Sequence, residues 1–265
     1  FLANGGSASA GGAVDIENGT SFIFENCRFV TNTANDAGCV YLNCNDSPSV
    51  RFANCQFTNS IARTGSGGAI YLVNTFASVT ITNCPFKANK ADNYGGAVYT
   101  GNGTSMSVLD CFFDDNDATN LDGTPEASER GGALYLGNVN LTVWNCPFLG
   151  CGADDDGGAM FMGAGNLTIL NSYFTNCTVA GGDGGAFYQA AAGTETCTIS
   201  NCWFTANTAA SDAGAFYVSE GDYLYLYDCG FTNNTATADY GGAVYLGGTR
   251  VLGVASNCTF QSWNT

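Results

Sequence analysis

Two short motifs recur along the whole chain and keep one common period. The first is Gly-Gly-Ala followed by an apolar and usually an aromatic residue; the second is Asn/Asp-Cys-x-Phe, often continued as Phe-x-x-Asn. The second glycine of the first motif, degenerate copies included, lies at 12, 38, 68, 96, 132, 158, 185, 214 and 242. The phenylalanine of the second motif lies at 29, 57, 86, 113, 148, 174, 204, 231 and 260. Two independent motifs with one period of about 28 residues predict a repeat architecture.

The repeat is predicted to be all-β. Residues 49–52 and 167–169 alternate in character and favour β-branched and aromatic side chains, while glycine pairs and Asn/Asp clusters interrupt the chain at short intervals. The period is too short for a four-stranded propeller blade, and the leucine pattern of a leucine-rich repeat is missing. We therefore expect one domain over residues 1–265, a right-handed parallel β-helix (β-solenoid) of about nine coils with three short strands per coil. An acidic loop insertion is expected at about residues 117–130.

Equivalent side chains of successive coils should stack into columns in such a fold. The phenylalanines are expected to form an internal ladder, and the glycine pairs should allow unusual backbone angles and a close approach of the coils. Asparagines before the cysteine are expected to form an amide ladder at a bend, at 26, 54, 83, 145, 171, 201 and 257. Strand alternation places the aromatic column after Gly-Gly-Ala on the surface, whereas a register shift of one residue would bury it. That column comprises residues 41, 71, 99, 135, 161, 188, 217 and 245.

The motifs resemble the repeats of the chlamydial polymorphic outer-membrane proteins, which are defined by Gly-Gly-Ala-Ile and Phe-x-x-Asn. The second motif matches at residues 29–32, 86–89, 113–116, 204–207 and 231–234. The resemblance covers essentially the whole chain and implies a β-helix outside the cell. In that family such repeats form the exposed passenger of autotransporter adhesins.

The 13 cysteines contain no CxxC pair, which favours a secreted, oxidising setting. One column predicts either a buried thiol ladder or disulfides between coils, with Ser172 in place of one cysteine; it comprises cysteines 27, 55, 84, 111, 146, 202, 229 and 258. Cys151 and Cys177 replace the last residue of Phe-x-x-Asn in consecutive coils, so a disulfide between them is the most specific covalent prediction. Cys39 and Cys44 form a weaker candidate pair.

Glycosylation sequons point to N-linked glycans and to an extracellular or cell-surface location. Five are expected in one turn, between the Gly-Gly-Ala strand and the next strand, at Asn18, Asn45, Asn102, Asn140 and Asn166. Asn176 and Asn233 share a second column two residues after the phenylalanine, and Asn257 belongs to the amide column. The alternative is that these are ordinary turn asparagines.

The charge of −16 argues against nucleic acid and anionic membranes as partners, and no apolar run is long enough for membrane insertion. Acidic residues recur just before the glycine pair, at Asp36, Asp92, Glu129, Asp154, Asp155, Asp156, Asp183, Asp212 and Asp239. We expect a solvated turn here; Ca²⁺ is the alternative, with Asp154, Asp155 and Asp156 as weak candidate ligands. The acids keep the register of the repeat and histidine is absent, so no catalytic residues and no enzyme are expected.

The chain begins with Phe1-Leu2-Ala3-Asn4 and ends just beyond Phe260, at the same phase of the repeat, without a capping helix. The expectation is a piece of a longer solenoid or end-to-end self-association into a filament. The expected function is therefore a non-enzymatic, glycosylated, extracellular structural protein of a fibre or surface appendage. The alternatives are an adhesin stalk that binds a host or surface partner, including glycans, and a polysaccharide-active β-helix enzyme.

Overall fold

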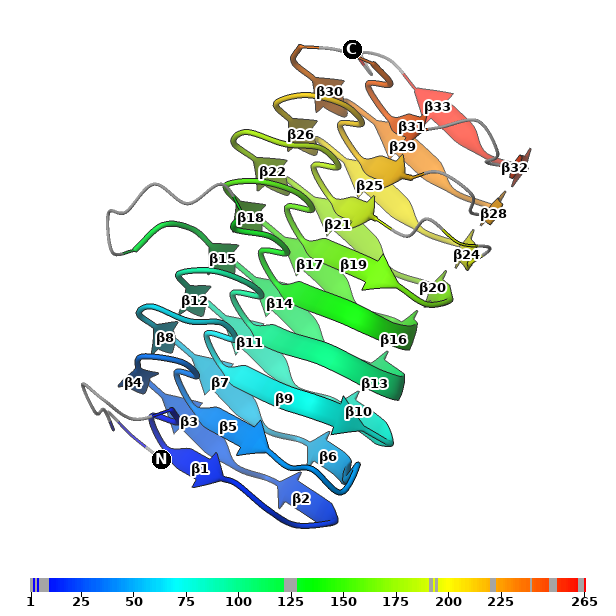
Figure 1. Ribbon diagram of the computed structural model, residues 1–265. Helices are drawn as coiled ribbons and strands as arrows, with labels where there is room; N and C mark the ends of the chain where they lie inside the picture. The colour runs from blue at the N-terminus through cyan, green and yellow to red at the C-terminus, as the bar shows by residue number, and fades with distance from the viewer. Residues whose placement is uncertain are drawn as a thin grey trace.

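The computed structural model describes residues 2, 4, 10–121, 128–190, 193, 195–219, 223–238, 240–247, 252–261 and 265. Within these residues the chain is a β-solenoid with three parallel sheets, whose coils lie one above the other (Figure 1). The predicted all-β solenoid with three sheets is confirmed. The expected acidic loop starts later than predicted, because residues 117 and 118 form a strand; residues 122–127 of that loop lie outside the described residues.

The sheet that carries the phenylalanine column, here called the Phe sheet, has nine strands of three residues each. They are β3 (Arg28–Val30), β7 (Gln56–Thr58), β11 (Pro85–Lys87), β14 (Phe112–Asp114), β17 (Pro147–Leu149), β21 (Tyr173–Thr175), β25 (Trp203–Thr205), β29 (Gly230–Thr232) and β33 (Thr259–Gln261). A second sheet has eight strands of two residues: β4 (Thr33–Ala34), β8 (Ile61–Ala62), β12 (Lys90–Ala91), β15 (Asp117–Ala118), β18 (Gly152–Ala153), β22 (Thr178–Val179), β26 (Thr208–Ala209) and β30 (Thr235–Ala236).

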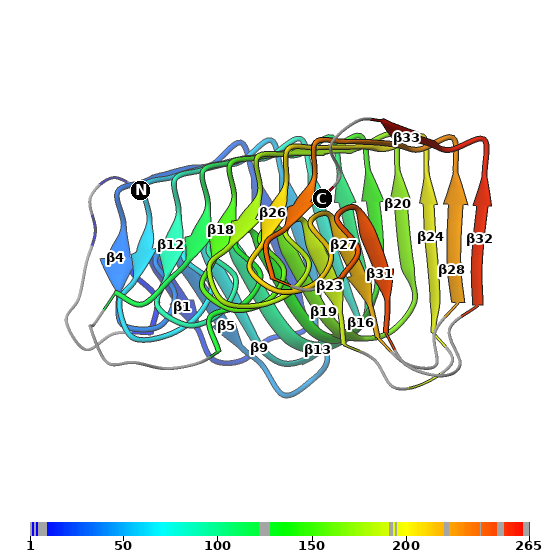
Figure 2. The same ribbon diagram turned by 90° about the horizontal axis from the view of Figure 1, so that it is seen from above.

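The third sheet has 16 strands and two arms. The arm that follows the glycine pairs contains β1 (Val14–Ile16), β5 (Val40–Asn43), β9 (Ile70–Phe76), β13 (Val98–Leu109), β16 (Leu134–Trp144), β19 (Met160–Ala164), β23 (Phe187–Gln189), β27 (Phe216–Val218) and β31 (Val244–Leu246). The second arm contains β2 (Ser21–Glu25), β6 (Ser49–Ala53), β10 (Ser78–Thr82), β20 (Leu167–Leu170), β24 (Thr196–Ser200), β28 (Tyr223–Tyr227) and β32 (Leu252–Ser256). The long strands β13 and β16 belong to both arms, and Figure 2 shows β20, β24, β28 and β32 side by side.

Single residues in the left-handed conformation form two corners of the coil, one before every strand of the Phe sheet and one after each of its strands from β3 to β29. The first corner is the Asn/Asp before the cysteine column, as at Asn83 with φ 51° and Asn145 with φ 53°. The second corner lies two residues after the phenylalanine, as at Asp115 with φ 58°. Asn and Asp tolerate this conformation better than other non-glycine residues, which explains why they dominate the first corner.

The phenylalanines stack face to face inside the solenoid, as predicted. Neighbouring ring centroids lie 4.6–5.0 Å apart with interplanar angles of 1–5°. The first eight rings are fully buried, and only Phe260 in the last coil is 53% exposed. This ladder fills one side of the core, while apolar residues of the two-armed sheet fill the other side.

The two glycines of a pair have different structural roles. The first has a positive φ in every pair except Gly11-Gly12, for example 68° at Gly131, which favours glycine. The second lies so close to the next coil that a Cβ at Gly132 would be 2.1 Å from the carbonyl oxygen of Gly158. Both expected roles of the glycine pair are therefore present, one in each glycine.

The predicted amide ladder is present at the first corner. Asn83 Nδ2 donates to Asn54 Oδ1 at 2.8 Å, and Asn201 Nδ2 donates to Asn171 Oδ1 at 2.7 Å. Aspartate interrupts the ladder at Asp110 and Asp228, because an ionised carboxylate only accepts hydrogen bonds. The amides of this ladder are exposed to solvent.

A second, buried amide ladder was not expected. The asparagine that ends Phe-x-x-Asn points into the solenoid and is fully buried at 32, 89, 116, 207 and 234. Asn116 Oδ1 accepts from the backbone N–H of Asn89 at 3.1 Å and from Asn89 Nδ2 at 3.0 Å, while Asn116 Nδ2 donates to the carbonyl oxygen of Phe86 at 3.0 Å. The ladder thus satisfies backbone groups that the corner leaves without a sheet partner.

The expected disulfide between Cys151 and Cys177 is not present, nor is one between Cys39 and Cys44. The cysteine column is instead a ladder of hydrogen-bonding side chains. Cys146 Sγ donates to the carbonyl oxygen of Trp144 at 3.2 Å and accepts from the N–H of Cys111 at 3.3 Å. Ser172 makes the same two bonds with its hydroxyl, at 2.9 Å to the Leu170 oxygen and 3.1 Å from the Cys146 N–H. The thiol of Cys146 thus fills a small buried space and acts both as a hydrogen-bond donor and as an acceptor. The column therefore does not need disulfide bonds to be well packed.

Candidate functional site

The acidic row runs along the turn before the glycine pairs, and its carboxylates act as acceptors between coils. Asp156 Oδ1 accepts from the N–H of Asp183 at 3.1 Å, and Asp183 Oδ1 accepts from the N–H of Asp212 at 2.8 Å. Asp212 Oδ1 accepts from the N–H of Tyr240 at 2.7 Å. These bonds satisfy backbone donors in a turn that has no sheet partner for them, which accounts for acids in register with the repeat. Asp239 lies outside the described residues.

Arg130 lies among the carboxylates that had been weak candidates for a metal site. Its guanidinium is 2.8 Å from Asp155 Oδ2 and 3.1 Å from Asp156 Oδ2, and it lies 5.1 Å from the ring centroid of Phe161. Among the described residues, no group of three or more His, Cys, Asp or Glu side chains is arranged to hold a metal ion. Two of the three candidate ligands, Asp155 and Asp156, are thus paired with an arginine.

Burial raises the pKa of several acids in this row. The pKa of Asp156 is raised from 3.8 to about 6, chiefly by desolvation and in smaller part by the neighbouring carboxylates. Desolvation also raises the pKa of Asp183, Glu129 and Asp36. These four carboxylates therefore hold protons more strongly in the folded protein than in the unfolded chain.

Stability should fall as the pH rises through this window. Between about pH 3.8 and pH 6 the folded protein binds more protons at Asp156 than the unfolded chain does, so ionisation destabilises the fold by on the order of 2 kcal/mol. We expect the urea midpoint to decrease from pH 4.5 to pH 7, and this decrease should be smaller in Asp156→Asn, which keeps the acceptor oxygen. An equal pH dependence in the two proteins would contradict the assignment.

The aromatic column after Gly-Gly-Ala faces outward, as alternation predicted, and its members are half-buried apart from the buried Phe161. From Tyr99 to Tyr217 the rings stack face to face, with centroids 4.6–5.4 Å apart and interplanar angles of 5–12°. Tyr71 is perpendicular to its two neighbours. Because stacked rings cover one another's faces, this stripe offers mainly ring edges and hydroxyls to a partner. Burial raises the pKa of Tyr135 to about 12, so the phenol stays neutral at physiological pH.

All seven candidate sequon asparagines are exposed, as glycan attachment requires. The five that were expected in one turn do not all form one column, however. Asn140 stacks on Asn166 and accepts a hydrogen bond from its N–H at 2.9 Å, whereas Asn102 pairs with Asn138 because the register shifts in the bend. The amide of Asn140 also donates to the carbonyl oxygen of Thr104 at 3.1 Å. Asn176 and Asn233 both occupy the second left-handed corner, with φ 56°.

Among the described residues, no helix is long and apolar enough to cross a membrane.

Comparison with known proteins gives two matches that agree with the solenoid. The probable autotransporter YfaL of Escherichia coli (strain K12) is 26% identical over 193 residues, an alignment that covers 52% of this chain and 15% of that protein. No solved structure matches the chain significantly. The family model described as "Right handed beta helix region" matches residues 67–260, well over half of the chain, so the protein belongs to the right-handed β-helix family.

Proposed function

We propose that this chain is a non-enzymatic, rod-like structural segment of an extracellular or cell-surface protein. The observation that carries the proposal is that the columns of polar side chains form hydrogen bonds between neighbouring coils. The buried amides, the exposed amides, the thiols and the acidic row all bond from one coil to the next. Acids that are occupied as acceptors for backbone N–H groups are poorly placed to serve as the paired carboxylates of a glycosidase.

The relatives support a place outside the cell. An autotransporter is named among the similar proteins, and the Gly-Gly-Ala and Phe-x-x-Asn motifs resemble the chlamydial surface repeats. The chain spans only 15% of the autotransporter's length, so the whole activity of that protein is not carried over. N-linked glycans on the exposed sequons are part of the proposal, and a loss of mass after treatment of the native protein with a peptide N-glycosidase would support them.

An activity assay separates this proposal from the enzyme alternative. The purified chain is incubated with a panel of neutral and acidic polysaccharides, with and without Ca²⁺, and newly formed reducing ends and unsaturated products are measured. The proposal expects no product above the buffer control. Product formation that scales with protein concentration and survives repurification would contradict it.

End-to-end stacking with a second copy is a further candidate, favoured by the surface of the last coil. Leu246, Val254 and Phe260 are 36%, 39% and 53% exposed there, and a hollow of about 230 Å³ lies among apolar side chains. At the opposite end of the solenoid, Ile16 and Phe24 are only partly buried. Ile16 belongs to the column that ends at Leu246, and Phe24 belongs to the column that ends at Ala255. Electron microscopy should show filaments or stacked rods that Phe260→Asp shortens; isolated rods at high protein concentration would contradict stacking.

A further inference from the structure

The outer face of the Phe sheet departs from the repeat at one place. The column that precedes each phenylalanine carries side chains such as Pro147, Tyr173 and Trp203, but the next coil has Gly230, which pairs directly with Trp203. Tyr173 and Trp203 are 46% and 50% exposed. A single glycine in a column of larger residues leaves a space beside the last aromatic ring of the column.

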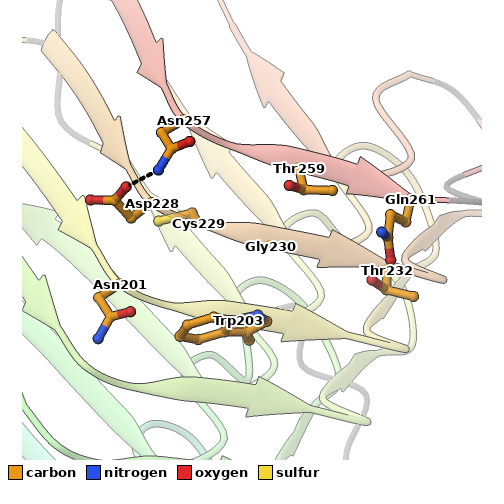
Figure 3. A pocket seen from close by; sticks show the side chains of 9 residues that line it. All are labelled: Asn201, Trp203, Asp228, Cys229, Gly230, Thr232, Asn257, Thr259 and Gln261. Carbon is orange, nitrogen blue, oxygen red and sulfur yellow. Dashed lines mark hydrogen bonds between the residues drawn. The ribbon is translucent and has the colours of Figure 1, made fainter.

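This space is a hollow of about 490 Å³ with the indole of Trp203 in its wall (Figure 3). A Cβ at position 230 would lie 2.7 Å from Cδ1 and 2.9 Å from Nε1 of Trp203, so the indole rests against the bare backbone of Gly230. The volume of the hollow falls within the range of roughly 300–1,000 Å³ that small-molecule sites occupy.

Hydrogen-bonding groups surround the indole. Asp228 interrupts the exposed amide ladder here: Asn257 Nδ2 donates to Asp228, but the Asp228 carboxylate has no N–H to offer to the Oδ1 of Asn201. Asn201 and Asp228 therefore present acceptor oxygens at one end of the hollow. The hydroxyls of Thr232 and Thr259 line it elsewhere, as Figure 3 shows.

The coil with Asp110 is an internal comparison. It has the same interruption of the amide ladder, since Asn145 Nδ2 donates to Asp110 Oδ1 at 2.7 Å. In that coil, however, Phe112 occupies the position that glycine holds at 230. Within the part of the chain that the structure describes, only the coil with Asp228 combines the open acceptors with a missing side chain beside an exposed tryptophan.

We propose that this hollow binds a neutral pyranose unit of a glycan. The indole offers an apolar face to the C–H groups of the sugar ring, while Asp228 and Asn201 accept hydrogen bonds from its hydroxyls. None of the described residues that line the hollow is basic, and the carboxylate of Asp228 repels anionic sugars. The site goes beyond the proposed structural role, because a rod could be structural with or without it.

The test uses glycan binding by the full chain. A panel of immobilised neutral oligosaccharides built from glucose, galactose, mannose or N-acetylglucosamine is probed, beside sialylated and sulfated glycans and a proline-rich peptide. The best neutral oligosaccharide is then titrated against the wild type and three variants. Trp203→Ala and Gly230→Val should each weaken binding at least about tenfold, and Trp144→Ala, which removes an exposed tryptophan outside the hollow, should change it less than about twofold.

Three outcomes would overturn the proposal. They are no binding of any neutral oligosaccharide by the wild type, equal binding by Trp203→Ala and the wild type, and binding of the proline-rich peptide alone. Because Trp203 is half exposed, its removal should leave the fold intact, and an unchanged urea midpoint checks this. None of these outcomes bears on the reducing-end assay, so the structural proposal and the glycan site can fail separately.

Discussion

Replacement of Gly132 by alanine is expected to prevent the central coils from stacking as they do in the native protein. The new Cβ would lie 2.1 Å from the carbonyl oxygen of Gly158 and 2.4 Å from that of Gly152, and both contacts are to backbone. Backbone on both sides cannot yield without moving the coils apart and lengthening their hydrogen bonds. We expect a loss of at least about 3 kcal/mol in the free energy of unfolding, seen as low soluble yield and a lower urea midpoint.

Gly150→Ala is the matched control. Gly150 has φ 57°, yet no atom lies within 4 Å of a Cβ placed there. The loss of stability in this control variant therefore reflects only the cost of placing alanine in the left-handed conformation, about 1–2 kcal/mol. If Gly132→Ala were tolerated as well as Gly150→Ala, the close approach of the coils at the glycine column would be wrong.

Removal of one ring from the phenylalanine ladder should have the second largest effect. Phe113 is fully buried, and its ring centroid lies 5.0 Å from that of Phe86 and 4.6 Å from that of Phe148. Phe113→Ala leaves a cavity inside the solenoid and removes one of the two stacking partners of Phe86 and of Phe148. We expect it to lower the free energy of unfolding by about 3–5 kcal/mol, measured by urea denaturation.

The neighbouring residue provides the control for this variant. Phe112 lies on the same strand β14 with its side chain on the opposite, partly exposed face. Phe112→Ala should cost less than about 1.5 kcal/mol, because little of its surface leaves a packed interior. Equal losses in the two variants would mean that the strand is not oriented as described.

The fold could be predicted because each coil repeats the same physical solution. The period places Phe113 above Phe86, and strand alternation then places Tyr135 on the outside, as the structure shows. Strand alternation does not continue through the corners. After Phe113 the chain turns at the left-handed Asp115, so Asn116, which a continuous strand would direct outward, points inward and is fully buried.

The candidate site was harder to predict because it depends on which residues face one another across coils. The spacing placed Cys151 and Cys177 in one column, and the disulfide was inferred from that stacking, but the structure holds both as buried thiols. Arg130 could not be assigned to Asp155 and Asp156 without the register across the insertion. The hollow beside Trp203 had a detectable signal, namely an aspartate and a glycine that break two columns in the same coil.

Surface labelling of the cells that produce the native protein tests the central claim most directly. Antibodies against the folded chain are applied to intact, unpermeabilised cells, and the label is measured before and after brief treatment with an external protease. An extracellular structural rod predicts strong labelling that the protease removes while a cytosolic marker stays intact. Labelling that appears only after permeabilisation, with the chain protected from the protease, would contradict the account.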